Sequence, residues 1–102
     1  MHIVAAMVTL HIHASASLKD KRRVIHSVVS KLRNRFSVSA AEVHANDSWQ
    51  SATIGIAVVG GDLRTLEQLM DRALSFVESA APEAEVVGVE TDEWSFGVGS
   101  NV

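Results

Sequence analysis

The sequence predicts a single α+β domain, and two patterns of apolar residues lead to that prediction. In several short segments apolar residues alternate with other residues, which is typical of strands that bury one face. In two longer segments they recur every three or four positions, which is typical of helices packed against a sheet. With 102 residues, of which 47% are hydrophobic, the chain can form one hydrophobic core but not two.

The first predicted strand covers residues 2–13. Its even-numbered positions are apolar from Val4 to Ile12, so they form the expected core face. The opposite face carries Met7, Thr9, His11 and His13.

The first predicted helix starts at Ser17 and ends near Arg35. Ser17 and Asp20 have the spacing of a capping box, and Asp20 suits the positive end of the helix dipole. The predicted core side consists of Leu18, Ile25, Val28, Val29, Leu32 and Phe36, with Val24 extending it. Lys21 lies close to this side, and we expect its stem to cover apolar surface while its ammonium group reaches water.

Two strands are expected after this helix. Residues 36–43 form a weaker strand, and Asn46 and Asp47 mark the turn that follows it. Residues 49–59 alternate again and predict a third strand. The two strands are expected to pair as a hairpin.

A second helix is the clearest element of the C-terminal half. The segment Gly60-Gly61-Asp62 supplies a turn and an N-cap, and apolar residues then recur with helical spacing until Pro82 forbids continuation. Residues 86–91 form the last strand. Residues 97–102 are expected to be a flexible tail, which leaves residues 1–96 as the folded domain.

The predicted order of elements is therefore βαββαβ. With the preference for right-handed crossovers, this order predicts a ferredoxin-like sandwich, in which a four-stranded antiparallel sheet carries both helices on one face. A swapped or open variant is the structural alternative. The second face of the sheet is left open.

Composition excludes several functional classes. The chain has no cysteine, which removes disulfides, thiol nucleophiles and cysteine-based metal sites. No stretch approaches the roughly 18 to 20 uninterrupted apolar residues that cross a bilayer, and the first residues lack the pattern of a secretory signal. We therefore expect a cytoplasmic protein without a membrane partner.

Positive charge is concentrated in one segment. Seven of the nine Lys and Arg residues lie between Lys19 and Arg35, where Asp20 is the single acid, while the rest of the chain holds two basic residues and eleven acids. On the predicted helix five side chains form one row along one side, which we call the basic stripe: Lys19, Arg22, Arg23, His26 and Arg33. Lys31 lies with Arg35 on the opposite flank.

A charged helix face often does no more than keep a protein soluble. Within this stripe, however, basic residues lie four positions apart, where like charges cost a few tenths of a kcal/mol and no acid in the stripe offsets them. The second helix carries an acidic stripe of Glu67, Asp71 and Glu78, but a right-handed crossover points the two stripes away from each other. We thus expect a cationic edge beside the second strand and an anionic edge beside the last.

Clustered Lys and Arg beside an edge strand suit contacts with phosphates, which give salt-dependent affinity and little sequence discrimination. The chain has no Tyr, and the first and third predicted strands lack the paired rings on which RNA-binding sheets stack bases. Trp49 alone is available for stacking. The stripe therefore favours structured RNA over single strands.

Histidines offer a weaker interpretation. His11 and His13 share a face of the first strand, and His44 and Asp47 are expected near its end, so these residues are candidates for zinc or another divalent ion. Hydrogen bonds to neighbours explain strand histidines as well, and we expect no metal or cofactor. Glu42 and Asp47 do not form a defined acid/base pair, so a metal-dependent or phosphate-processing enzyme is the third hypothesis.

Several segments also resemble one known family. They are Ser17-Leu18-Lys19-Asp20-Lys21-Arg22-Arg23, Leu32-Arg33-Asn34-Arg35-Phe36, Ala41-Glu42-Val43, Trp49-Gln50 and Ala52-Thr53-Ile54-Gly55. Together they resemble the YlxP-like family of small bacterial proteins over residues 3–92. The resemblance implies a ferredoxin-like fold and a bacterial cytoplasmic origin. It also implies a role with RNA or ribosomes, because genes of the family tend to neighbour those for translation initiation and ribosome maturation.

The resemblance transfers no catalytic residue, and His13 stands where proline is common in the family. We therefore expect a non-enzymatic protein that binds structured RNA or a ribosomal particle through the basic stripe. The alternative is a protein-interaction module that uses the open sheet face to form a homodimer or to dock another protein. That face includes Met7, Thr9, His11, Ser51 and Thr53.

Overall fold

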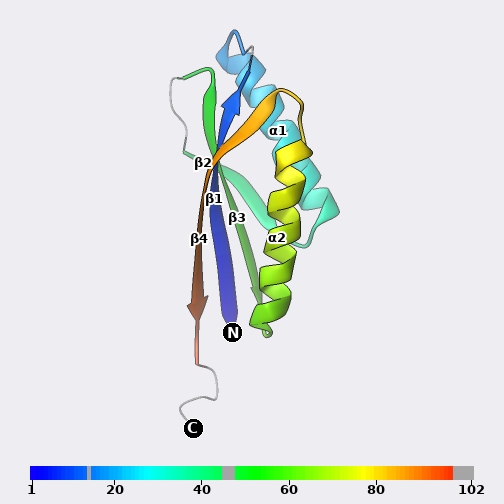
Figure 1. Ribbon diagram of the computed structural model, residues 1–102, viewed down its shortest axis with the longest axis vertical. Helices are drawn as coiled ribbons and strands as arrows, with labels where there is room; N and C mark the ends of the chain where they lie inside the picture. The colour runs from blue at the N-terminus through cyan, green and yellow to red at the C-terminus, as the bar shows by residue number, and fades with distance from the viewer. Residues whose placement is uncertain (14, 45–47, 98–102) are drawn as a thin grey trace.

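The computed structural model describes residues 1–13, 15–44 and 48–97. Along the chain its elements are β1 (His2–Ile12), α1 (Leu18–Arg35), β2 (Ser39–His44), β3 (Ser51–Gly60), α2 (Leu63–Ser79) and β4 (Ala84–Ser95). This order and the sheet they build confirm the predicted ferredoxin-like α+β fold (Figure 1).

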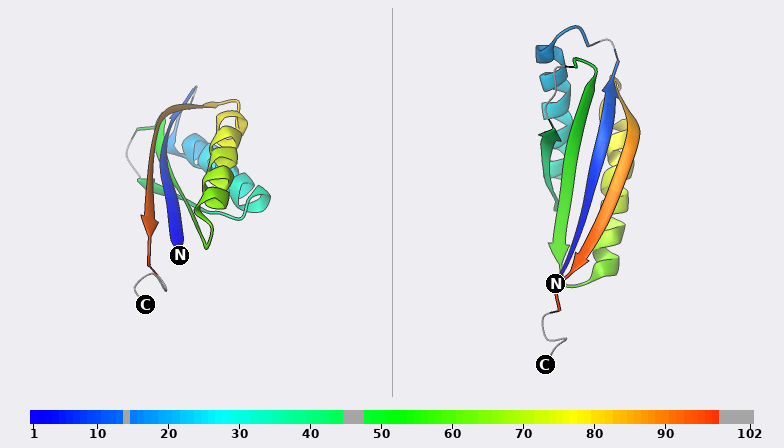
Figure 2. Two further views of the ribbon diagram at one scale, coloured as in Figure 1. Left: turned by 60° about the horizontal axis from the view of Figure 1, so that its bottom comes forward. Right: turned by 90° about the vertical axis from the view of Figure 1, so that its left-hand side faces the viewer.

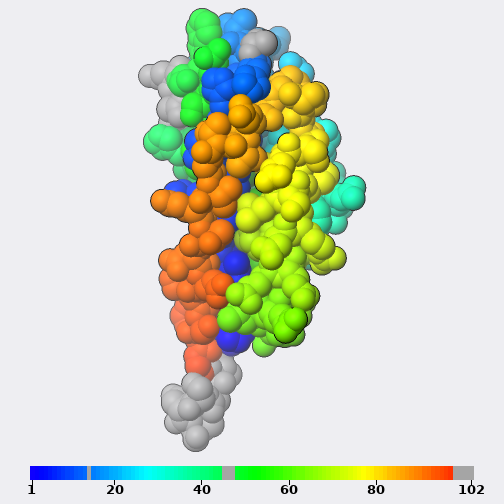
Figure 3. All heavy atoms as spheres, viewed as in Figure 1, coloured from blue at the N-terminus to red at the C-terminus, as the bar shows by residue number. Residues whose placement is uncertain are grey.

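The four strands form one antiparallel sheet in the order β2-β3-β1-β4. Both helices pack on the same face of this sheet, and the right-hand view of Figure 2 looks onto the face that they leave open. At the side of the molecule α2 and β4 lie next to each other, as the space-filling view shows (Figure 3). The outer strands β2 and β4 are the two edges of the sheet.

The core lies between the sheet and the helices. The largest side chains enclosed there are Leu10, Ile12, Leu32, Ile54, Ile56, Val8, Val28 and Val77. Each buried Leu, Ile or Val stabilises the fold by roughly 1.5 to 3 kcal/mol relative to its exposed state. As predicted, the even-numbered residues of β1 from Val4 to Ile12 are the buried ones.

Local hydrogen bonds fix the start of each helix. Ser17 Oγ accepts a hydrogen bond from the Asp20 N–H at 3.1 Å, and Asp20 Oδ2 accepts one from the Ala16 N–H at 3.1 Å. The first bond confirms Ser17 as the predicted N-cap of α1, whereas Asp20 bonds the residue before the cap instead of the N–H of Ser17 that a capping box would use. Asp62 is the N-cap of α2, where its carboxylate accepts a hydrogen bond from the Arg64 N–H at 3.2 Å.

The bounds of the strands differ from the prediction, by one residue in β1 and by more in the other three. The chain between α1 and Ser39 is not part of β2, because Phe36 is the C-cap of α1. β3 begins at Ser51 rather than at Trp49. β4 continues to Ser95, well beyond the predicted end, because its backbone stays paired with β1 as far as His2.

Lys21 contradicts the expected exposure of its ammonium group. The residue is only 4% exposed, and its Nζ donates hydrogen bonds to the carbonyl oxygens of Ser48 at 2.8 Å and Ser51 at 3.1 Å. The prediction was wrong because these carbonyl groups lie within reach of the buried ammonium and offset the cost of removing it from water. Lys21 therefore ties the first turn of α1 to the start of β3.

No helix in the described ranges is long and apolar enough to cross a membrane. Of the predicted flexible tail, residues 98–102 lie outside the part that the structure describes.

Candidate nucleic-acid interface

The structure places all five residues of the basic stripe on the outer side of α1. Its inner side packs into the core through Val24, Ile25, Val28, Val29 and Leu32. The stripe residues Lys19, Arg22, Arg23, His26 and Arg33 are exposed. The five side chains that helical spacing predicted to form one row thus lie on the same side of α1.

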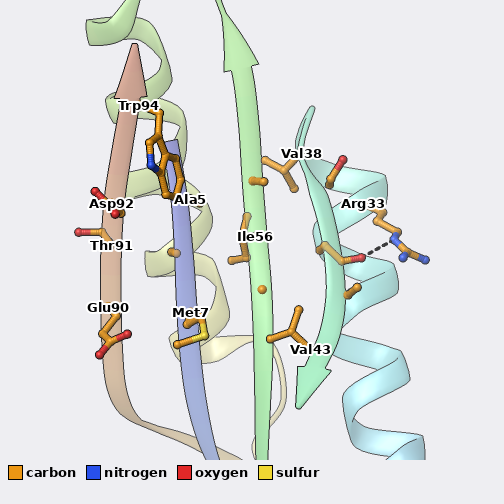
Figure 4. Close-up of a pocket in the computed structure, with 16 residues that line it drawn as sticks. Ala5, Met7, Arg33, Val38, Val43, Ile56, Glu90, Thr91, Asp92 and Trp94 are labelled. Carbon is orange, nitrogen blue, oxygen red and sulfur yellow. Dashed lines mark hydrogen bonds between the residues drawn. The ribbon is translucent and has the colours of Figure 1, made fainter. Parts of the chain in front are cut away.

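Part of the stripe borders the edge strand β2. Arg22, His26 and Arg33 line a groove of about 300 Å³ between α1 and β2, which also includes Glu42. Arg33 Nε donates a hydrogen bond to the Ala40 carbonyl oxygen at 2.8 Å, which holds its guanidinium group beside β2 (Figure 4). The cationic edge beside the second strand therefore exists, with the Glu42 carboxylate as one negative group in the groove.

The acidic stripe of α2 forms no ion pair with the basic stripe among the described residues. The ion pairs found there are His13–Glu85 at 3.1 Å and Arg23–Glu83 at 3.8 Å. The second pair joins side chains that are 68% and 39% exposed, and such surface pairs contribute at most about 1 kcal/mol. Glu83 precedes β4, so it lies outside the predicted acidic stripe.

The opposite flank of α1 faces α2 and uses its cations in packing. Lys31 Nζ donates a hydrogen bond to the Ala80 carbonyl oxygen at 2.8 Å, at the C-terminal end of α2, where the helix dipole favours positive charge. The guanidinium carbon of Arg35 lies 5.2 Å from the centre of the Phe76 ring, which is within the range of a cation–π contact. The sequence placed Lys31 and Arg35 on this flank but did not reveal these partners.

The candidate histidines form no metal centre within the described ranges. The rings of His11 and His13 lie edge to face with their centres 4.6 Å apart, and His13 Nε2 contacts Glu85 Oε1 at 3.1 Å. His44 is the last residue of β2 and pairs with Thr53, so that β3 lies between it and the histidines at the end of β1. No three His, Asp or Glu side chains in those ranges are grouped to hold a metal ion, and Asp47 lies outside them.

The anionic edge includes a pair of carboxyl groups from α2 and β4. The pKa of the Glu93 carboxyl is raised, first by its hydrogen bond with Glu67 and further by desolvation and the negative charges of Glu67 and Asp92. Negative charge is thus dense at the edge opposite the basic stripe.

A larger groove of about 830 Å³ lies on the open face of the sheet. Its floor includes Ala5, Gly55 and Ala57, and larger side chains from β1, β2 and β4 rise beside it, among them Met7, Val43 and Trp94 (Figure 4). Val43 lies over Gly55, where an added Cβ atom would come within 2.6 Å of Val43 Cγ1.

Two of the three large side chains around this groove were missed in the sequence. Val43 lies where the pairing of β2 with β3 shifts in register, so alternation does not show its direction. Trp94 lies beyond the predicted end of β4, although alternation through Glu90 and Asp92 would have placed it on the open face. The predicted open-face residues Met7, Thr9 and His11 do pair with open-face positions of β3.

Comparisons with known proteins place the chain in a family. The family model described as "Protein of unknown function (DUF503)" matches residues 3–91. The uncharacterized protein YlxP of Bacillus subtilis (strain 168) is 36% identical over 83 residues, which cover 81% of this chain and 88% of the relative.

Two solved structures share the fold. The de novo designed protein Foldit4 has a TM-score of 0.52 at 17% identity, covering 94% of this chain and 99% of its own. SnoaB, a cofactor-independent oxygenase from Streptomyces nogalater, has a TM-score of 0.54 at 10% identity, covering 92% of each chain. At such identities these similarities show the fold alone. The family match and the relative, by contrast, cover most of the sequence, and on both grounds the chain belongs to the YlxP-like DUF503 family.

Proposed function

We propose that the protein binds structured RNA, either free or within a ribosomal particle, through the basic stripe of α1. The observation that carries the proposal is that five basic residues of this helix are exposed in one row on its outer side. Lys21, by contrast, is buried, and Lys31 and Arg35 contact α2. Arg33 and Arg23 have partners as well, the Ala40 carbonyl oxygen and Glu83, but both side chains stay exposed.

The length and stiffness of α1 suit a nucleic-acid backbone. Lys19 and Arg33 lie fourteen positions apart on one helix, which corresponds to about 21 Å at 1.5 Å per residue. Several backbone phosphates of a duplex lie within that distance. A packed helix presents its cations without the entropy cost of ordering a loop.

The sheet is poorly suited to stacking bases. β1 and β3 contain no Phe, Tyr or Trp, whereas RNA-binding sheets stack bases on rings in their central strands. The Glu42 carboxylate in the groove beside β2 repels phosphate. We therefore expect phosphates to contact the stripe from its outer side, at Lys19 and Arg23 and at Arg22, which borders the groove.

The experiment compares RNA binding by the full chain with that of the double variant Arg22→Glu/Arg23→Glu. The probes are a fluorescent RNA hairpin and ribosomal particles purified from the source bacterium, each titrated at several salt concentrations. We expect the variant to lose at least tenfold in affinity, with the slope of log affinity against log salt reduced by roughly 1 to 2, as for the loss of about two phosphate contacts.

A matched control carries the same charge change on the other helix. Arg64→Glu/Arg72→Glu alters two exposed arginines of α2. We expect it to leave RNA affinity within about twofold of that of the unaltered chain, because salt screens the weak long-range repulsion between the new acids and the RNA. The proposal is wrong if the stripe variant and the control bind both probes equally at moderate salt. Crosslinking in cells, followed by sequencing of the attached RNA, then identifies the RNA species.

A further inference from the structure

The open face of the sheet exposes several large apolar side chains in one place. Met7 is 47% exposed, Val43 53% and Trp94 47%, and all three line the same 830 Å³ groove. Scattered exposed apolar residues are ordinary, but a contiguous patch with a polar rim usually marks an interaction site.

The two edges of this face carry opposite charges. On β4, Glu90 pairs with Met7 and Asp92 with Ala5, so both acids stand at open-face positions. At the other edge Arg33 lies beside β2 through its hydrogen bond to the Ala40 carbonyl oxygen. The open face is therefore acidic along one edge, apolar in the middle and bordered by Arg33 along the other (Figure 4), where Glu42 is paired with Ile54 and thus belongs to the helix-covered side.

We propose that this face binds a second copy of the same chain, sheet against sheet. A twofold dimer brings one patch against itself, so the patch must be complementary to itself. A twofold axis parallel to the strands meets this condition, because it lays the acidic β4 of each copy over the cationic β2 edge of the other. An axis across the strands would lay β4 over β4, where the acids repel one another.

The pairing of the strands then fixes which residues meet. Rotation about an axis parallel to the strands keeps every residue at its own level along the sheet. Glu90 is level with Met7, Gly55 and Ala41, and Asp92 is level with Ala5, Ala57 and Ser39. Arg33 is bonded to Ala40, which lies between these two levels. Each Arg33 therefore comes to lie between Glu90 and Asp92 of the other copy.

The middle of the face allows a close approach. Ala5, Gly55 and Ala57 keep its floor low, and Met7 of each copy comes over the level of Gly55 in the other. β4, β1 and β3 lie about 4.8 Å apart with at least ten paired positions at about 3.3 Å, and the shorter β2 adds five. Together they present a flat area of roughly 550 Å² before the side chains are counted, which approaches the roughly 800 Å² that each partner loses in a standard interface.

Two single variants, mixed, test both the dimer and its axis. Arg33→Glu places a new acid in each copy against the acidic edge of the other, and Asp92→Arg places a new cation in each copy against Arg33 of the other. Each variant alone is expected to dissociate with a Kd at least tenfold higher than the unaltered chain, measured by sedimentation velocity over a concentration series. In a one-to-one mixture the new glutamate of one variant meets the new arginine of the other, and the remaining Asp92 meets the remaining Arg33. The dimer is therefore expected to return.

The mixture also separates association from folding, because a chain that failed to fold could not be rescued by a second copy. Arg72→Glu, a like change on α2, is expected to leave the dimer intact. The proposal is overturned if the unaltered chain is a monomer throughout the concentration series, in which case another molecule covers the face. It is also overturned if the dimer persists in both single variants, or if the mixture remains monomeric.

This proposal is tested separately from RNA binding, although the two share Arg33. Arg33 lines the groove on the open face of the sheet, whereas Arg22 and Arg23 do not line it. The Arg22→Glu/Arg23→Glu variant is therefore expected to remain a dimer while losing RNA.

Discussion

The two faces of the sheet differ although they belong to the same strands. On the face covered by the helices, β1 contributes Val8 and Leu10, which are fully buried. On the open face the same strand contributes Ala5, Thr9 and the half-exposed Met7. The covered face has large, enclosed aliphatic side chains, and the open face has small ones with a few large exceptions.

This difference separates stability from recognition. Shortening a closely packed side chain removes both the free energy of transferring its atoms out of water and their van der Waals contacts. Substitutions on the covered face should therefore lower the stability of the fold. Side chains on the open face have room to move, so substitutions there should act mainly on association. Substitutions at Leu10, Lys21 and Glu93 test this separation.

The largest effect is expected from shortening a side chain of the covered face. Leu10→Ala should lower the free energy of unfolding by about 2 to 5 kcal/mol, because Leu10 is completely enclosed. Its neighbour Thr9 lies on the open face, and Thr9→Ala should change stability by less than about 0.5 kcal/mol. Urea unfolding in the Arg33→Glu background removes any contribution from association. If Leu10→Ala and Thr9→Ala lowered the free energy of unfolding equally, the proposed difference between the two faces would be contradicted.

A smaller effect is expected from the buried cation Lys21 at the end of the covered face. Lys21→Met keeps most of the apolar stem but removes the ammonium that binds the Ser48 and Ser51 carbonyl oxygens. Leaving these partly buried carbonyl groups without their donor should cost about 1 to 3 kcal/mol. The control Lys19→Met removes an exposed ammonium and should be neutral within about 0.5 kcal/mol. If the two variants had the same thermal unfolding temperature, the Lys21 ammonium group would not contribute to the stability of the fold.

The smallest effect is expected where the covered face ends, between α2 and β4. The pKa of Glu93 is raised by its hydrogen bond with Glu67, so the folded state holds its proton more firmly than the unfolded chain does. Such a group destabilises the fold when it is ionised, and stability recovers as the pH falls through the raised pKa toward the ordinary value of 4.5.

Glu93→Gln removes that ionisation. We therefore expect the variant to be more stable than the unaltered chain at pH 7, with a difference that shrinks as the pH falls through the raised pKa of Glu93. The check is urea unfolding at several pH values. Glu67→Gln removes the carboxyl partner and should reduce the same pH dependence, whereas a constant difference at every pH would contradict the assignment.

Much of the fold could be predicted because local patterns decide it. Alternation fixed the buried face of β1, and the cap residues Ser17 and Asp62 marked the helix starts. The end of β4 could not be predicted, because its residues at an exposed edge show no apolar alternation and are held by backbone pairing with β1. Backbone pairing between segments that are far apart in the chain produces no pattern among neighbouring residues of the sequence.

The candidate site could be predicted only in part for the same reason. Helical spacing is a local property, so the stripe from Lys19 to Arg33 followed from the sequence alone. Which cations are used inside the fold depends on groups remote in the chain, such as the Ala80 carbonyl oxygen that binds Lys31. The prediction for Lys21 was wrong because its partners lie at the start of β3, far along the chain.

The edge strands of the sheet also determine whether copies of the protein can associate into a longer sheet. An unpaired edge strand offers a row of free backbone groups on which further strands can add without limit. Here β2 is short, shifts in register near Val43 and has its Ala40 carbonyl oxygen occupied by Arg33. The other edge carries closely spaced acids that repel a like strand. Both edges are thus disfavoured for the strand-by-strand addition that builds fibres.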